Sequence, residues 1–311
     1  MSVKRKILKI FNILIRKGHW FNEVEFPSCY KFWVYNTFNT EVVNLGSTSA
    51  LYAFNYEGLS IKAANWALVH NPLLGDCAIL KNYFSYLRSE GSTVILPLCV
   101  FSSLAGSYDI CEDRYYSLLY PASIPHFSYR RQQRVKSLVK NPVLHYPLYA
   151  LFSDIKYFLF RKRCIKLTEV QMEADANAWI RDWTHEFSLS DLSTSLSLIN
   201  KDSINDAADI LNDIIKFCRE RRVRLVIVIP PMYHTLAEKF TPDIRRVFVG
   251  ALLEKMINRD VVFLDYMGDE EFTNNRELFR NSFFLNKKGA KIFTRKVLTD
   301  IGILKHPQTR Y

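Results

Sequence analysis

Two runs of nearly continuous apolar residues constrain the fold of this chain more than any other feature. They read STVILPL at residues 92–98 and VRLVIVI at 223–229. Runs of this kind are typical of strands that are buried on both faces of a parallel sheet. Three weaker β-branched or apolar runs accompany them, at residues 41–45, 62–68 and 261–264.

Helical patterns lie between these runs, at residues 76–89, 202–222, 242–258 and 287–304. Strands that alternate with helices predict an α/β protein with a doubly wound parallel sheet. Ligands of such sheets bind beyond the carboxyl ends of the strands. Chemistry is therefore expected just after Leu45, Leu98, Ile229 and Leu264.

The alternation stops between about residues 103 and 201, which we interpret as a helical insertion. Residues 127–166 contain ten Lys or Arg and one acidic residue, Asp154. The expected organisation is an N-terminal helix and lead-in (1–40), an α/β domain (41–304) that carries the insertion, and a short tail (305–311). Because the whole chain holds 42 Lys and Arg against 31 Asp and Glu, an anionic neighbour is expected.

The N-terminal segment predicts a basic amphipathic helix. Ile7, Leu8, Phe11, Leu14 and Ile15 recur at helical spacing among six Lys or Arg residues. Such a helix either docks on its own domain or anchors weakly on an anionic membrane face. No apolar run is long enough to predict a transmembrane helix, and no signal peptide is predicted.

The cysteines and glycines exclude some classes of site. None of the six cysteines forms a C-x-x-C pair or has histidines at metal-ligand spacing, so no bound metal is expected. The same cysteine pattern predicts a reducing, cytoplasmic location. With only ten glycines, a Gly-rich nucleotide site is disfavoured, and no cofactor is expected.

The first candidate site directly follows the first predicted strand and reads Asn44-Leu45-Gly46-Ser47-Thr48-Ser49. A glycine followed by hydroxyl residues at a strand end makes a tight turn that can expose a nucleophile. The same turn directs backbone N–H groups toward a developing oxyanion. The pattern alone is also common turn chemistry.

Two segments together carry a resemblance to a known family. VVNLGSTSALYAFNY (42–56) and SFFLNKKGAKIFT (282–294) resemble the SGNH/GDSL hydrolase superfamily, above all its branch found with bacterial surface-polysaccharide synthesis and teichoic-acid D-alanylation. The resemblance covers about residues 40–102 and 200–304. It implies a flavodoxin-like, three-layer α/β/α fold with a five-stranded parallel sheet, and carbohydrate-ester chemistry or carbohydrate binding.

The triad that this resemblance implies is incomplete. The nucleophile position falls on Thr48, and Ser47 stands where the family has Asp or Ser. The acid and base positions of the family's Asp-x-x-His segment fall on Asn281 and Phe284. Phe cannot accept a proton, and Asn cannot supply the negative charge that stabilises an imidazolium. The triad therefore cannot operate as written.

Two further residues complete the candidate site. His234 follows the fourth predicted strand and could serve as a relocated base for Thr48 or Ser47, or it could be an ordinary loop histidine. By its position in the family-like frame, Asn65 is a candidate oxyanion donor together with Gly46, although an Asn that closes a turn fits equally well.

A basic surface is expected on the insertion. Its residues would form either a solvated helix face or a surface for acidic glycans or anionic lipid, and nucleic acid is disfavoured because no recognition motif accompanies the charge. The residues are Arg130, Arg131, Arg134, Lys136, Arg161, Lys162 and Arg163.

Two functional hypotheses follow. In the first, the chain is a diverged, catalytically impaired SGNH-like protein that binds a glycan or a partner protein. In the second, it is an active carbohydrate esterase or O-acyltransferase with a rearranged Ser/Thr–His site. Peripheral contact with an anionic membrane is compatible with both. The acyl group, the sugar and the oligomeric state are not determined by the sequence.

Overall fold

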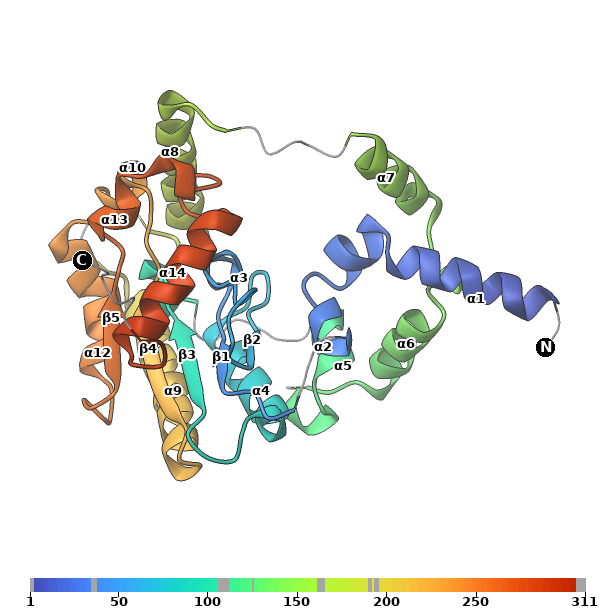
Figure 1. Ribbon diagram of the computed structural model, residues 1–311, viewed down its shortest axis with the longest axis horizontal. Coiled ribbons are helices and arrows are strands. Elements are labelled where there is room, and N and C mark those ends of the chain that lie inside the picture. The colour runs from blue at the N-terminus through green and yellow to red at the C-terminus, as the bar shows by residue number, and fades with distance from the viewer. Residues whose placement is uncertain are drawn as a thin grey trace. The chain divides into compact units, whose positions relative to one another are not determined.

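The computed structural model describes residues 3–34, 38–105, 112–124, 126–160, 166–189, 192 and 196–305 (Figure 1). The chain forms two compact units. Unit 1 comprises Met1–Thr37, Ala78–Phe84 and Asp109–Ile165, and unit 2 comprises Phe38–Cys77, Ser85–Tyr108 and Lys166–Tyr311.

Unit 2 contains a five-stranded, all-parallel sheet in the order β2-β1-β3-β4-β5. Each strand falls within one of the predicted runs or extends it by one residue, and the α/β fold class is confirmed. The two strands with the longest apolar runs, β3 and β4, pair at the centre, where both faces are buried. The strands are β1 (Val42–Asn44), β2 (Ala63–Asn65), β3 (Thr93–Pro97), β4 (Arg224–Ile229) and β5 (Val262–Asp265).

Helices cover both faces of this sheet and make three layers (Figure 1). On one face, Ile95 and Val228 pack in a cluster with Phe293 of α14 (Lys287–Asp300) and with Ala53 of α3 (Thr48–Ala53). A second cluster joins Ile229 to residues of α9 (Leu198–Glu220) and to the segment that precedes α12 (Ala251–Glu254). In β4 and β5, the side chains therefore alternate between two separate hydrophobic cores.

The remaining elements of unit 2 are short, apart from α8. The predicted helix at 76–89 is α4 with a following 3-10 turn, and the one at 242–258 is α11, a π-turn and α12. The bounds are α4 (Leu73–Tyr83, whose second half belongs to unit 1), α8 (Glu169–Glu186), α10 (His234–Ala237), α11 (Pro242–Arg245) and α13 (Glu270–Thr273), with 3-10 turns at Phe84–Tyr86, Val100–Ser103 and Arg276–Leu278 and a π-turn at Arg246–Gly250.

Unit 1 is helical. The predicted N-terminal helix is present as α1, in which Asn12 and Ile15 are buried. The Asn12 side chain accepts a hydrogen bond from the Val143 N–H, and Arg16 donates to the Val139 and Lys140 carbonyls. The elements are α1 (Val3–Arg16), a π-helix (Trp20–Glu25), α2 (Tyr30–Val34), α5 (Asp113–Leu118), α6 (Tyr129–Lys140) and α7 (Leu148–Leu159), with 3-10 turns at Pro121–Ser123 and Pro142–Leu144. Over the residues that the structure describes, no helix is both long and apolar enough to cross a membrane.

Candidate functional site

The turn after β1 requires glycine. Gly46 has φ +111°, in the region that L-residues with a side chain rarely adopt. A Cβ there would lie 2.5 Å from the Ala50 Cβ. The chain can therefore leave β1 and enter α3 after only three residues, which brings Ser47, Thr48 and Ser49 to the carboxyl edge of the sheet.

A buried carboxylate fixes this turn. Asp76, near the start of α4, accepts hydrogen bonds from the Gly46 N–H at 2.7 Å and from the Asn71 side chain at 2.6 Å. Burial raises the pKa of Asp76 to about 7, even though both hydrogen bonds favour the ionised form. The site thus contains a carboxyl group that titrates close to neutral pH.

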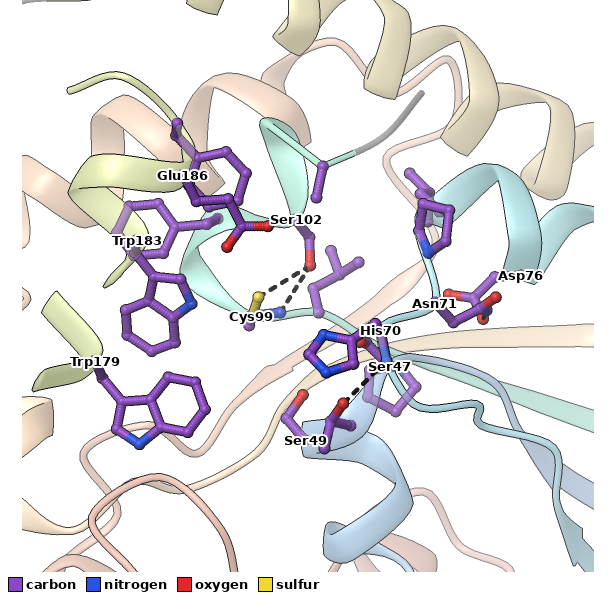
Figure 2. A pocket seen from close by; sticks show the side chains of 18 of the residues that line it. Ser47, Ser49, His70, Asn71, Asp76, Cys99, Ser102, Trp179, Trp183 and Glu186 are labelled. Atoms are coloured by element: carbon purple, nitrogen blue, oxygen red, sulfur yellow. Dashed lines mark hydrogen bonds between the residues drawn. The ribbon is translucent and has the colours of Figure 1, made fainter. Parts of the chain in front are cut away.

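A cavity of about 280 Å³ opens at this edge of unit 2. Figure 2 shows Trp179 and Trp183 of α8 on one side and Asn71 and Asp76 on the other. Aromatic and aliphatic side chains line this cavity together with polar groups, a mixture that suits a small-molecule site. The polar lining residues are Ser47, Thr48, Ser49, His70, Asn71, Asp76, Cys99, Ser102 and Glu186.

The two predicted nucleophiles both line this cavity. Ser47 is the N-cap of α3, but its side chain makes no capping hydrogen bond. The Thr48 hydroxyl accepts a hydrogen bond of 3.0 Å from the backbone N–H of His70. His70 is exposed, has φ +49° and also lines the cavity.

The predicted base, His234, lies elsewhere. It begins α10 and lines a different cavity, with Thr241 and Arg245. Its Nε2 is 3.0 Å from a Glu169 carboxylate oxygen, and the other oxygen of Glu169 accepts from the Tyr233 hydroxyl. The structure therefore does not bring His234 into the cavity that holds Ser47 and Thr48. Instead, His234 helps to attach the start of α8.

Two further ties hold α8 in place. Glu173 forms an ion pair of 2.7 Å with Lys239. Asp175 accepts hydrogen bonds from the backbone N–H and the hydroxyl of Ser282, at 3.0 and 2.5 Å. Together with Glu169, these residues fix the first two turns of α8 and so orient the tryptophans that follow.

The predicted oxyanion donors differ in their placement. Gly46 directly precedes the lining residue Ser47 but does not itself line the cavity, and its N–H is donated to Asp76. Asn65 does not line the cavity. Both hydrogens of its amide go to backbone carbonyls, those of Leu51 and Phe54. The turn-closing alternative describes Asn65, because its side chain ties β2 to α3.

The two positions where the resemblance implies an acid and a base, Asn281 and Phe284, form a turn and carry neither group. Asn281 accepts hydrogen bonds from the Phe283 and Phe284 N–H groups, which forms a turn. The Phe284 ring lines the cavity and packs against Tyr52 and Trp179, at 5.1 and 5.4 Å between centroids. An aromatic wall thus occupies the place where the resemblance implies an imidazole.

Residues 285–289, which also belong to the segment that carries the resemblance, lead into α14. The Asn286 side chain accepts from the Lys288 and Gly289 N–H groups and caps α14. A Cβ at Gly289 would lie 2.2 Å from the Leu278 carbonyl oxygen, so the close packing of this helix requires glycine.

Thiol and metal chemistry find no support at this site. Burial raises the pKa of Cys99, which keeps its thiol protonated, and the Ser102 hydroxyl lies 3.5 Å from its sulfur. Across the described parts of the chain, no group of three or more His, Cys, Asp or Glu residues could hold a metal ion.

The predicted basic surface belongs to unit 1 and is partly neutralised. Arg131 and Arg134 both pair with Asp113, each at 2.5 Å. Arg130 and Lys136 are exposed on α6. Arg161, Lys162 and Arg163 lie outside the described residues.

The sequence analysis missed several residues of the cavity, namely Asn71, Asp76, Trp179, Trp183 and Glu186. A signal was present for the tryptophans, because residues four apart share one face of a helix. For Asp76 the signal was weaker: a carboxylate near the start of a helix that follows the second strand.

Comparisons with known proteins identify no family. No protein-family model matches the chain, and no curated protein is significantly similar to it. One solved structure, of a Streptococcus pneumonia protein provisionally described as a platelet activating factor, aligns with a TM-score of 0.40 and 11% identity, over 96% of this chain and 99% of that chain. A similarity of this size carries no argument about activity.

Proposed function

We propose that this chain binds a carbohydrate ligand in the cavity of unit 2 and that it does so without an SGNH-type catalytic triad. The finer part of the proposal comes from the resemblance: the ligand is a sugar, with or without an O-acyl group, of a bacterial surface polysaccharide. One observation carries the proposal. Trp179 and Trp183 face a set of polar groups across one cavity of about 280 Å³.

The chemistry of the two walls suits a sugar. A pyranose ring has an apolar face of C–H groups, which packs on aromatic rings, and an edge of hydroxyl groups, which need hydrogen-bond partners. Indole rings supply large apolar surface at little conformational cost. Ser47, Asn71 and Asp76 offer donors and acceptors on the other side. The volume suits one small ligand group rather than a long chain.

The absence of a complete triad favours binding over hydrolysis. Phe284 and Asn281 can neither take up a proton from Thr48 nor orient a base. His234, the relocated base that we considered, is engaged by Glu169 outside the cavity. Without a general base, a neutral hydroxyl is a poor nucleophile.

Binding is tested by titration of the full chain with glucose, N-acetylglucosamine and 6-O-acetylglucose, followed by tryptophan fluorescence and calorimetry. Trp179→Ala is expected to weaken the affinity for the best of these sugars at least about tenfold, as loss of an aromatic anchor does. The matched control is Phe38→Ala, which removes an exposed ring that stacks on Tyr86 in the same unit. Equal affinity in wild type and Trp179→Ala, or no binding of any sugar, would refute the proposal.

A second function is supported by a specific observation. Ser47, Thr48 and His70 line the same cavity, next to Asp76 with its pKa of about 7. Ester hydrolysis or acyl transfer with His70 in place of His234 is the alternative. It requires that the chain hydrolyse p-nitrophenyl acetate and that Ser47→Ala or Thr48→Ala, and also His70→Ala, each reduce that rate about 100-fold or more. Equal rates in wild type and these variants would exclude this alternative and leave only the binding function.

A further inference from the structure

The net positive charge of the chain comes from unit 1. This unit contains 18 of the 42 Lys and Arg residues but only 6 of the 31 Asp and Glu residues, a formal charge of +12. Unit 2 contains the other 24 basic residues and 25 acidic ones, a formal charge of −1. The unit that carries the candidate sugar site is therefore nearly neutral, and the anionic neighbour expected from the sequence belongs to the other unit.

Unit 1 also exposes an apolar helix face. In α7, Leu148, Phe152 and Phe158 are 81, 70 and 82% exposed. With 3.6 residues per turn, six exposed apolar residues of this helix share one side, while the exposed Tyr149 and Tyr157 lie outside it. A face of this kind on a soluble protein marks an interaction surface. We call it the α7 face, and it consists of Leu148, Leu151, Phe152, Ile155, Phe158 and Leu159.

Contacts made by the opposite side of α7 hold the helix with the α7 face outward. Asp154 accepts hydrogen bonds of 2.7 Å from the Trp20 N–H and from the Tyr146 hydroxyl. Ala150 is fully buried, and the Tyr157 ring lies 4.3 Å from the His19 ring. A Cβ at Gly18 would lie 2.4 Å from the Asp154 carboxylate, so this contact is close-packed. The α7 face is thus turned outward by specific contacts.

The N-terminal helix has the same character. Ile7, Ile10, Phe11 and Leu14 of α1 are about half exposed and lie on one side of the helix. Of its exposed lysines, Lys6 lies at the edge of this side, one turn before Ile10, and Lys9 lies on the opposite side. An apolar stripe beside a basic stripe is the pattern of helices that lie in a membrane surface.

We propose that unit 1 binds the surface of an anionic lipid bilayer, with the apolar faces of α1 and α7 inserted at the level of the headgroups. Each helix is too short and too polar on one side to span the bilayer, so each lies in its plane. The apolar side chains leave water, and the excess of +12 attracts the lipid phosphates.

The charge favours a bilayer over a second copy of the chain. Two copies that meet through this unit would bring together two surfaces of +12 and repel each other, whereas an anionic membrane attracts both the charge and the apolar faces. Attachment of this kind would hold the nearly neutral unit 2 near lipid-linked or membrane-bound glycans, but it does not depend on the sugar site.

Flotation of the full chain with vesicles tests this proposal. One set of vesicles is phosphatidylcholine alone and the other is a mixture with phosphatidylglycerol. We expect at least about tenfold stronger binding to the anionic set, reduced by high salt. Phe152→Ser with Phe158→Ser is expected to lower that binding about tenfold. The matched control is Leu198→Ser with Ile199→Ser, which removes two comparably exposed apolar residues from unit 2 and is expected to leave it unchanged.

The exposed position of both phenylalanines predicts that the variant folds, which thermal unfolding checks. If it does not fold, Lys6→Glu with Lys9→Glu provides the test, since both lysines are exposed, and weaker binding to the anionic vesicles is again expected. No binding to either vesicle set, equal binding to both sets, or equal losses in the test and control variants would overturn the proposal. So would a dimer in solution that the α7 variant dissociates while vesicle binding is absent. Sugar binding by Trp179→Ala is scored separately, so failure of one proposal leaves the other standing.

Discussion

The backbone N–H of Gly46 donates a hydrogen bond of 2.7 Å to the buried carboxylate of Asp76. This contact ties the turn that presents Ser47 and Thr48 to the start of α4. It also places a group with a pKa of about 7 in the lining of the cavity that the candidate nucleophiles share. The protonation state of Asp76 is therefore coupled both to the shape of the turn and to the stability of the fold.

The first prediction concerns pH. In the unfolded chain Asp76 has its ordinary pKa of 3.8, so between about pH 4 and 7 the folded state keeps a proton that the unfolded state has lost. The Asp76 contribution to the free energy of unfolding therefore falls as pH rises through this window and levels off above it. Comparison of urea unfolding of wild type and Asp76→Asn across pH 4–8 isolates this group. Parallel pH profiles of the two proteins would contradict the prediction.

The second prediction concerns the turn itself. Gly46→Ala forces a Cβ to 2.5 Å from the Ala50 Cβ in addition to an unfavourable φ. Gly58 also has a positive φ, +82°, but nothing lies within 4 Å of its Cβ position. Gly58→Ala should thus cost about 1 kcal/mol from backbone strain alone, and Gly46→Ala about 2 kcal/mol more. Thermal unfolding measures both, and equal losses would show that the turn yields to the extra carbon.

The third prediction is that His234 does not contribute to ligand binding in the cavity. Because its ring contacts Glu169 at a partly exposed site, His234→Ala should cost less than about 1 kcal/mol of stability. The Tyr233 hydroxyl still holds Glu169, so α8 should keep its place. Sugar affinity is then expected to change less than about threefold, far below the effect of Trp179→Ala. A loss of sugar affinity as large as that of Trp179→Ala, measured by calorimetry, would show that His234 contributes to the binding site.

The sheet could be predicted because strands that are buried on both faces must be apolar along their whole length, as STVILPL and VRLVIVI are. That signal is local and needs no knowledge of distant contacts. The turn at Gly46 could be predicted for the same reason, since its glycine and hydroxyl residues adjoin a strand end.

The far wall of the cavity could not be predicted in this way. The position of Trp179 depends on ties between residues far apart in the chain, such as Asp175 with Ser282. Likewise, His234 was expected near Thr48 because both follow strands whose carboxyl ends share one edge of the sheet, but the Glu169 carboxylate holds its ring elsewhere. The carboxyl ends of strands limit where a site lies, but not which side chains turn into it.

The fourth prediction concerns the introduction of the acid and the base that the resemblance implies. Thr48 and Phe284 line one cavity, and the Asn281 side chain caps the turn that carries Phe284. Asp can accept the same two hydrogen bonds as Asn281, so Asn281→Asp with Phe284→His should keep the turn and add an acid and a base. Combined with Thr48→Ser, these changes are expected to raise p-nitrophenyl acetate hydrolysis about 100-fold over wild type, the usual contribution of a general base. The control carries Ala at position 48. An equal rate in that control would show that the new histidine does not reach the hydroxyl at position 48. The resemblance of these segments to a triad would then be limited to sequence.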